Sequence, residues 1–181
     1  MEITVSEHIL SFASEYDITT PCGDYRARKE IFSFTDRIHL TAAGGAELAR
    51  IEGEISPLRH KHEFFLNDGH TYRFECEKLW KQVYTCEGDG ESYHLIEHHG
   101  LKYSIFNGDR QIAAFVKNCV VFGKGHRYDV RMESDANLIV VLCMVLTISA
   151  SEDQNDKETV TIDLGNIGPE DRPFDEDWEP R

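Results

Sequence analysis

Hydrophobic and polar residues alternate in short runs along most of the chain before about residue 133. In one such run, Tyr72, Phe74 and Cys76 occupy every second position. Because side chains of a strand point to opposite faces in turn, this period of two predicts β-strands with one buried face. Turn residues separate the runs at intervals of roughly ten residues, which predicts about twelve strands.

The alternating runs also come in repeated pairs. Units that begin at Ile9, Ile31 and Ile55 each contain an apolar opening, an alternating run, a Gly-containing turn and a second alternating run. A fainter copy has its turn at Asn107-Gly108. Because Asn and Gly tolerate the positive φ angles of tight turns, such dipeptides indicate hairpins. We therefore expect each unit to form a two-stranded antiparallel hairpin.

The stretch DANLIVVLCMVLTIS, residues 135–149, has a different pattern, because apolar residues cover every side of a helical wheel. The run from Leu138 to Ile148 has only eleven residues, and a membrane span needs about 20. We therefore predict a buried helix over about 135–150 and no transmembrane segment, with Ser134 or Asp135 as its N-cap. The predicted core residues of this helix are Leu138, Ile139, Val141, Leu142, Val145 and Leu146.

Simple geometry combines these elements into one architecture. A closed sheet of about twelve tilted strands leaves a channel roughly 12 Å wide, and a helix is about 10–12 Å across. We therefore expect a mainly β fold, in which a closed antiparallel barrel is wrapped around one central hydrophobic helix. Residues 1–151 would form this domain.

Residues 152–181 are expected to form an acidic C-terminal extension, with a net charge of −8 out of the total of −14. Residues 158–164 alternate and predict one added strand, followed by an irregular tail. Phe174 and Trp178 lie four positions apart among acidic residues. They would dock into the groove of a protein partner or fold back onto their own barrel, and the sequence favours neither.

The net charge of −14 and the pI near 5.0 disfavour nucleic acid as a partner, because phosphate backbones attract positive fields. Five cysteines without a C-x-x-C motif indicate reduced thiols. The N-terminal segment has acidic residues where a signal peptide has basic ones. These features favour a cytoplasmic protein.

Two short basic clusters, RARK and RHKH, are candidates for binding a phosphorylated head group. On a strand, Arg26 and Arg28 share a face, as do Arg59 and Lys61, so that each pair could hold a phosphate with several donors. The alternative is that these side chains solvate the outer wall and balance an acidic surface.

Metal and catalytic chemistry have weaker support. His60 and His62 share a strand face, but neither they nor His98-His99 have a third ligand at a recognisable spacing, and zinc needs three or four. The chain has no nucleophile elbow, P-loop, dinucleotide fingerprint or H-E-x-x-H motif. We therefore predict no metal, no cofactor and no enzymatic activity.

The phrases ILSFASEYDI, IFSFTDRIHL, GGAELARIEGEISPLRHKHEFF, NDGHTYRFECEKLW and NGDRQIAAFVK, followed by the apolar helix, resemble the LURP-one-related family. This family belongs to the tubby C-terminal-like superfamily, which also includes the phospholipid scramblases. The resemblance covers roughly residues 9–150 and implies a twelve-stranded barrel around one helix. It implies little about activity, because most members have no assigned reaction.

Tubby proteins bind phosphoinositide head groups, and scramblases add lipid anchors and a Ca²⁺ site. The present sequence has no Cys-rich palmitoylation segment and no EF-hand loop, so scramblase activity is not carried over. We predict a non-catalytic binding or scaffolding module, whose partner is a protein or a phosphorylated head group. The alternatives are a phosphoinositide-binding tubby-like protein, and an enzyme or metal-binding protein that uses the loops at the barrel rim.

Overall fold

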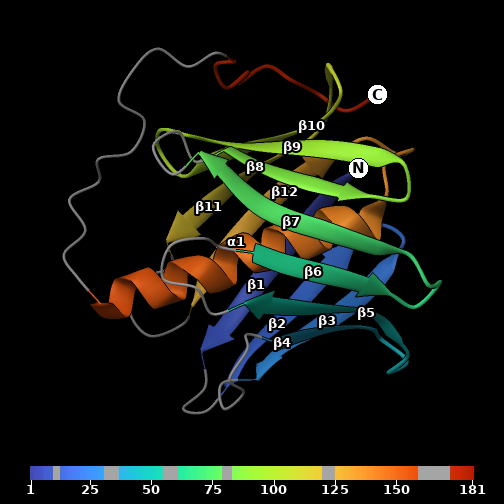
Figure 1. The fold of residues 1–181 in the computed structure, drawn as a ribbon. Coiled ribbons are helices and arrows are strands. Elements are labelled where there is room, and N and C mark those ends of the chain that lie inside the picture. The colour runs from blue at the N-terminus through green and yellow to red at the C-terminus, as the bar shows by residue number, and fades with distance from the viewer. Residues whose placement is uncertain (10–12, 31–36, 55–60, 79–82, 120–124, 159–171) are drawn as a thin grey trace.

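A computed structural model describes residues 1–9, 13–30, 37–54, 61–78, 83–119, 125–158 and 172–181, and the account below concerns these residues. They form twelve strands followed by one helix (Figure 1). In chain order the elements are β1 (Glu2–Ile9), β2 (Ala13–Thr20), β3 (Gly23–Glu30), β4 (Arg37–Ala42), β5 (Glu47–Glu54), β6 (Lys61–Leu66), β7 (Thr71–Lys78), β8 (Val83–Gly88), β9 (Glu91–His98), β10 (Lys102–Asn107), β11 (Arg110–Cys119), β12 (His126–Met132) and α1 (Leu138–Glu158).

The predicted hairpin repeats are present. The pairs β2 and β3, β4 and β5, β6 and β7, and β10 and β11 are each antiparallel neighbours. The turn at Asn107-Gly108 joins the last of these pairs, and Gly108 has a φ angle of +60°, which glycine adopts without steric cost. The apolar openings that begin at Ile31 and Ile55 lie outside the described residues.

The sheet closes into a barrel because its first and last strands pair. Each strand is hydrogen-bonded to the next one along the chain, and β1 pairs antiparallel with β12, with Val5 opposite Tyr128. Closure leaves none of the twelve described strands with an unpaired edge, which removes a common route to aggregation. The prediction of a closed antiparallel barrel with about twelve strands is confirmed.

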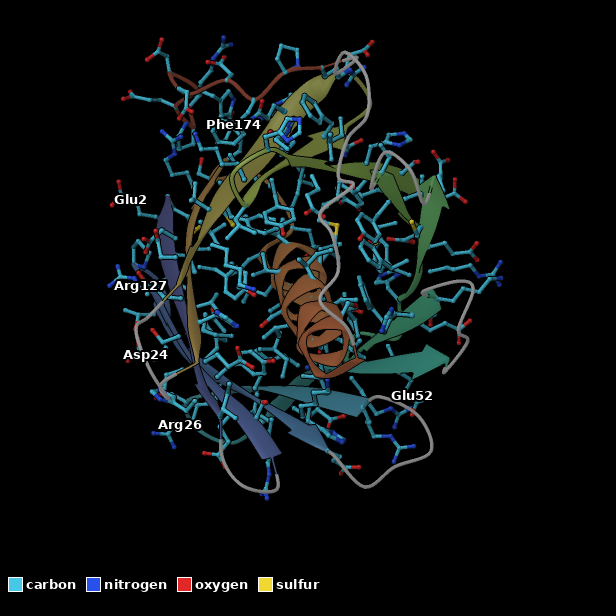
Figure 2. All side chains as sticks on the ribbon, turned by 90° about the vertical axis from the view of Figure 1, so that its left-hand side faces the viewer. Glu2, Asp24, Arg26, Glu52, Arg127 and Phe174 are labelled. Carbon is cyan, nitrogen blue, oxygen red and sulfur yellow. The ribbon has the colours of Figure 1, made fainter. Side chains whose placement is uncertain are left out.

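Helix α1 occupies the inside of this barrel, and strands surround it on all sides (Figure 2). Every side chain from Val140 to Ala150 is at most 2% exposed, whereas Leu138 and Ile139 at the entrance are only partly buried. Large inward side chains from around the wall pack against it, including Tyr16, Leu40, Ile51, Phe64, Tyr93 and Phe115. The predicted central hydrophobic helix is therefore confirmed.

The ends of α1 differ from the prediction of 135–150. The helix begins at Leu138, where the Asn137 side chain accepts a hydrogen bond from the Val140 backbone N–H at 3.3 Å. Asp135 is not the N-cap, because its carboxylate accepts two hydrogen bonds from Arg110, at 2.7 and 3.0 Å. The N-cap position is thus taken by the residue that adjoins the first turn.

At its other end α1 continues to Glu158 and extends past the strands (Figure 1). The sequence EDQNDKE ends the apolar pattern, but Glu, Gln and Lys still favour helix where solvent surrounds the backbone. The predicted strand at 158–164 therefore has its first residue in the helix, and its remainder lies outside the described residues. Among the helices described here, none has both the length and the apolar character to cross a membrane.

One basic residue of the RARK cluster has a structural role inside the barrel. Lys29 is only 6% exposed, and its Nζ donates a hydrogen bond to the carbonyl oxygen of Ala150 at 3.1 Å. Ala150 is buried and is followed by the half-buried Ser151, so Lys29 binds a backbone acceptor where burial of the helix begins to decrease. Arg26 and Arg28 lie on the opposite face of β3 and remain exposed.

Removal of buried volume from the central helix should destabilise the whole barrel. Leu142 is fully buried, so we expect Leu142→Ala to lower the free energy of unfolding by about 2–5 kcal/mol. Ile9→Ala is the matched control, because Ile9 is 53% exposed and its loss should change stability by less than about 0.5 kcal/mol. Urea unfolding measures both values, and equal shifts for the two variants would contradict a central role for the helix.

Candidate functional site

Because α1 occupies the interior, candidate sites lie on the outer wall and at the barrel rim. The wall groove is a hollow of about 360 Å³ lined by Glu52, Gly53, Lys61, His62, Glu63, Arg73 and Glu75. The mouth pocket, about 280 Å³, is lined by Glu91, Tyr93, Asn107, Arg110, Ile112, Asp135, Ala136 and Asn137. The tail face is the outer patch that residues 172–181 contact through His98, Lys102, Phe106 and Asp109. Ser104 lies beside it, and its Oγ is 3.1 Å from His98 Nε2.

The structure places Arg26 and Arg28 on one outer face, as predicted, and places Lys61 of the second predicted pair on a different strand. Arg26 and Arg28 lie on the outer face of β3, whereas Lys61 lies on β6, and strands β4 and β5 separate them. Arg59 lies outside the described residues. Arg26 is ion-paired with Asp17 across the strand pair, with 3.5 Å between Nε and Oδ1. The described candidates therefore do not form one phosphate site.

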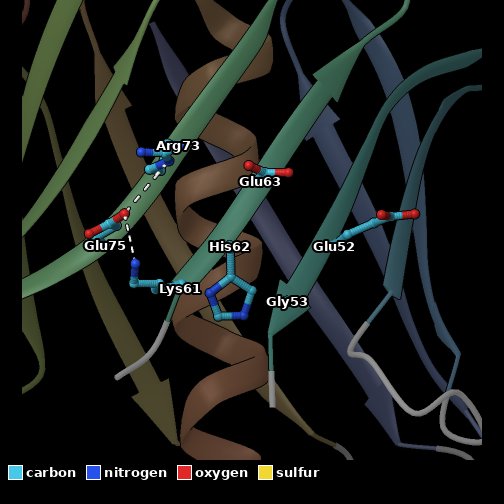
Figure 3. Close-up of a pocket in the computed structure, with 7 residues that line it drawn as sticks. All are labelled: Glu52, Gly53, Lys61, His62, Glu63, Arg73 and Glu75. Atoms are coloured by element: carbon cyan, nitrogen blue, oxygen red, sulfur yellow. Dashed lines mark ion pairs between the residues drawn. The ribbon is translucent and has the colours of Figure 1, made fainter. Parts of the chain in front are cut away.

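In the wall groove, both cations bind the same carboxylate. Lys61 Nζ lies 3.4 Å from Glu75 Oε1, and Arg73 Nε lies 3.6 Å from the same oxygen (Figure 3). Glu52 and Glu63 also line the groove, so that it contains three carboxylates against two cations. A phosphate would have to displace Glu75 and would face two further negative charges.

Ion pairs continue from the wall groove across the neighbouring strands. Glu52 Oε1 lies 3.3 Å from Arg37 Nε on β4 and 3.1 Å from Arg50 Nε on its own strand. Arg37 in turn reaches Glu30 on β3 at 3.8 Å. The arginines of this part of the wall are therefore paired within the protein. This supports the interpretation that the basic residues balance an acidic surface.

Of the candidate histidine pair, the structure describes only His62. His62 points inward, is 6% exposed, and its ring centroid lies 6.5 Å from that of Phe74. His60 lies outside the described residues. Within the described ranges, no group of three or more His, Cys, Asp or Glu side chains is arranged to hold a metal ion.

The mouth pocket contains a cluster of phenols around one carboxylate. The hydroxyl of Tyr72 donates a hydrogen bond to Glu91 Oε2 at 3.2 Å, and the hydroxyl of Tyr93 donates to the same oxygen. Burial, followed by the charge and hydrogen bond of Glu91, raises the pKa of Tyr72 to about 12, and burial and Glu91 also raise the pKa of Tyr93. Both phenols therefore stay protonated at neutral pH.

Two buried thiols lie inside the barrel. Burial is the largest cause that raises the pKa of Cys86, to about 12, and burial also raises the pKa of Cys143. A catalytic nucleophile or general base needs a pKa close to the working pH. The resolved shifts of these thiols and of the two phenols go in the opposite direction, so they do not prepare these groups for catalysis.

The C-terminal segment lies against the outside of the barrel (Figure 2). The ring of Phe174 packs edge-on against His98 at 5.4 Å between centroids, and Lys102 Nζ lies 5.3 Å from the centre of the Phe174 ring. Arg172 forms an ion pair with Asp109 at 2.6 Å. Of the two open alternatives for Phe174, the structure places this ring on its own barrel.

Sequence reasoning missed the tail face. His98 and Lys102 are four residues apart and flank a turn, which indicates no shared function. The sequence did contain one indication of a covered outer face. Ser104, Phe106 and Ala114 alternate with inward residues and therefore belong to the outer face, yet they are small or apolar. Only pairing of β10 with β11 shows that Ser104 and Ala114 are opposite each other on the outer side.

The comparison with protein families gives one match. The family model described as LURP-one-related matches residues 1–148. No curated protein and no solved structure matches the chain. The matched region begins at the first residue and ends within α1, and it contains all twelve described strands.

We expect Glu91→Gln to lower the pKa of Tyr72 from about 12 toward the ordinary value of about 10, because the substitution removes a negative charge and weakens the hydrogen bond. Burial remains, so the pKa should stay above 10. The pKa of this phenol is higher in the folded state than in the unfolded state. Its contribution to the free energy of unfolding is therefore fully present below about pH 10 and is lost between about pH 10 and 12. The measurement is tyrosinate absorbance against pH, with Tyr72→Phe to identify the signal. An identical titration in both proteins would contradict the role of Glu91.

Proposed function

The chain belongs to the LURP-one-related family, and on this basis we propose that it is a non-catalytic module that binds a protein partner on the outer wall of its barrel. The family and the barrel around a helix suggest a tubby-like binding domain. The finer proposal is that the partner is a protein and that the outer wall is the recognition surface.

The observation that carries this proposal is the filled interior. Residues Val140 to Ala150 of α1 are at most 2% exposed, and the wall packs around them. Many ligand-binding barrels hold a small molecule in an open interior. Here the interior contributes stability, so recognition is assigned to the strands' outward residues and to the loops.

Two further observations support parts of this proposal, the first that the protein is non-catalytic and the second its location. The resolved pKa shifts of Tyr72, Tyr93, Cys86 and Cys143 keep these groups protonated. Cys22, which is exposed, is a free thiol and fits the reducing conditions of a cytoplasmic location. We include that location in the proposal.

The proposal is tested by photo-crosslinking with the full chain. A photoreactive amino acid replaces one exposed outward residue on each side of the barrel, namely Arg28, Glu63 or Asn118, and the chain is incubated with an extract of its own cells. We expect the photoreactive residue on one side of the barrel to crosslink to a defined protein. Excess chain without a photoreactive residue should reduce the yield of this crosslinked product. The proposal fails if no position gives a crosslinked product whose yield excess chain reduces. It also fails if the purified chain converts a small molecule at a rate proportional to the concentration of the chain.

A phosphorylated head group is the second candidate, and the wall groove tests it. Because Lys61 and Arg73 share Glu75 and face two more carboxylates, we expect weak binding to vesicles that contain anionic phospholipid. Lys61→Ala and Arg73→Ala should each change vesicle binding by less than about twofold, as measured by cosedimentation. Arg26→Ala is the matched control on another part of the wall. A tenfold loss in either groove variant alone would assign head-group binding to the groove.

A further inference from the structure

Several outward residues of β10 and β11 are buried although they do not face the helix. Tyr103 and Ile105 belong to the interior cluster, and Ser104 between them is 1% exposed and does not. Phe106 is 8% exposed and Ala114 is 1% exposed, and neither is part of that cluster. Figure 2 shows the segment with Phe174 outside these strands. The C-terminal segment therefore covers a face that would otherwise expose apolar area.

The segment is held through every second residue. Arg172 lies over the ring of Phe106, with 4.8 Å between its guanidinium carbon and the ring centre, and also pairs with Asp109. Phe174 contacts His98 and Lys102, and Glu176 forms an ion pair with Lys102. In an extended chain, residues two apart point to the same side. The tail face therefore contacts Arg172 and Phe174, which lie two apart, and Glu176, which lies in the turn that follows.

The segment turns at residues 175–178 and is anchored a second time beyond the turn. The backbone N–H of Trp178 approaches the carbonyl of Asp175 at 3.4 Å, and the N–H of Asp177 donates to the Asp175 carboxylate at 3.0 Å. The backbone N–H of Arg181 then donates to Glu133 at 2.8 Å, in the loop that precedes α1. The contact with Glu133 fixes the position of the last residue relative to the barrel.

We propose that the tail face is the docking site for an acidic, aromatic-containing segment of a partner protein, and that the chain's own residues 172–181 occupy this site until the partner displaces them. This inference rests on the proposed function and specifies the partner's chemistry and its site. The acidic residues at 175, 176, 177 and 179 give the occupant its charge, and Lys102 is the cation at the centre of the site. A partner segment with the same pattern would make the same contacts.

The contacts of the tail suit an occupant that exchanges. Asp109 is 99% exposed, Glu176 is 66% exposed and Arg172 is 41% exposed, measured on their side chains. Ion pairs in such positions are screened by water and salt, and each stabilises little. By contrast, α1 is buried on all sides. The tail is thus the part of the described chain that can leave the barrel without loss of the core.

The experiment uses the full chain and a synthetic peptide with the sequence of residues 172–181, labelled with a fluorophore. The double substitution Arg172→Ala and Phe174→Ala should release the chain's own tail. We expect the peptide to bind this variant at least about tenfold more tightly than the wild type, because a tethered competitor acts at an effective concentration on the order of millimolar. Fluorescence anisotropy measures both affinities, and equal affinities overturn the proposal.

Controls locate the binding on the tail face. Lys102→Ala, added to the double variant, should reduce peptide affinity at least about tenfold, because the cation contacts both the Phe ring and the Glu carboxylate. Lys61→Ala is the matched control and should leave the affinity unchanged. A peptide with Ala in place of its Phe should not bind. Binding that persists with this peptide, or that is unaffected by Lys102→Ala, overturns the proposal.

A second measurement does not depend on the double variant. In the otherwise wild-type chain, Lys102→Ala should increase amide hydrogen exchange at residues 174–178, and Lys61→Ala should not. Absence of this increase overturns the proposal. Sedimentation tests the other occupant, because a dimer formed by the wild type and not by the double variant would assign the face to the tail of a second copy.

Failure of this inference is distinguishable from failure of the proposed function. If the peptide does not bind but a protein crosslinks to Arg28 or Glu63 positions, the binding module stands and the tail face is not its site. If the peptide binds the tail face but no wall position gives a competed crosslink from cell extract, the docking chemistry stands and the wider proposal fails.

Discussion

The structure depends on the mutual burial of one helix and the barrel around it. Helix α1 is apolar on every side, and such a helix is stable in water only if other elements surround it completely. A closed sheet of twelve strands has a channel of about the width of a helix, so neither part has to leave a void. Tyr103 and Phe115, stacked at 4.4 Å between centroids, are part of the wall that fills the remaining space. Because the interior is used in this way, it contributes stability.

The outer wall itself is divided into two kinds of surface. From β3 to β7, cations and carboxylates alternate and pair with each other, as Arg37, Arg50 and Glu52 do. A surface of this kind satisfies its own charges and offers little to an anionic ligand. On β9 to β11, by contrast, Lys102 and His98 contact residues that come from the distant C-terminal segment. The contrast explains why the basic residues that stand out in the sequence are not those that contact the C-terminal segment in the structure. Neighbours decide whether a cation is already neutralised, and neighbours across a sheet come from remote positions in the chain.

Sequence reasoning was successful where the pattern is local. The period of two fixed the faces of the strands, and Gly at turn positions such as Gly108 set the hairpins, because both depend on a few adjacent residues. It was less successful at the ends of the helix. Ser134 or Asp135 was expected to cap α1, but Asn137 is the cap, and Asp135 binds Arg110, a residue 25 positions away in the chain. Lys29 looked like a surface residue beside Arg26 and Arg28, and alternation along β3 turns it inward, where it meets the carbonyl of Ala150.

By itself, the sequence therefore determined the secondary structure, the mainly β architecture, the buried helix and the family resemblance. These follow from hydrophobic periodicity and turn chemistry, which act over short stretches of chain. Only the tertiary structure decided which charges are paired and where the C-terminal segment lies. The interaction of Phe174 with His98 joins residues 76 positions apart, and no local pattern specifies such a contact. Contacts between remote segments depend on barrel closure and strand register, and these are properties of the complete fold.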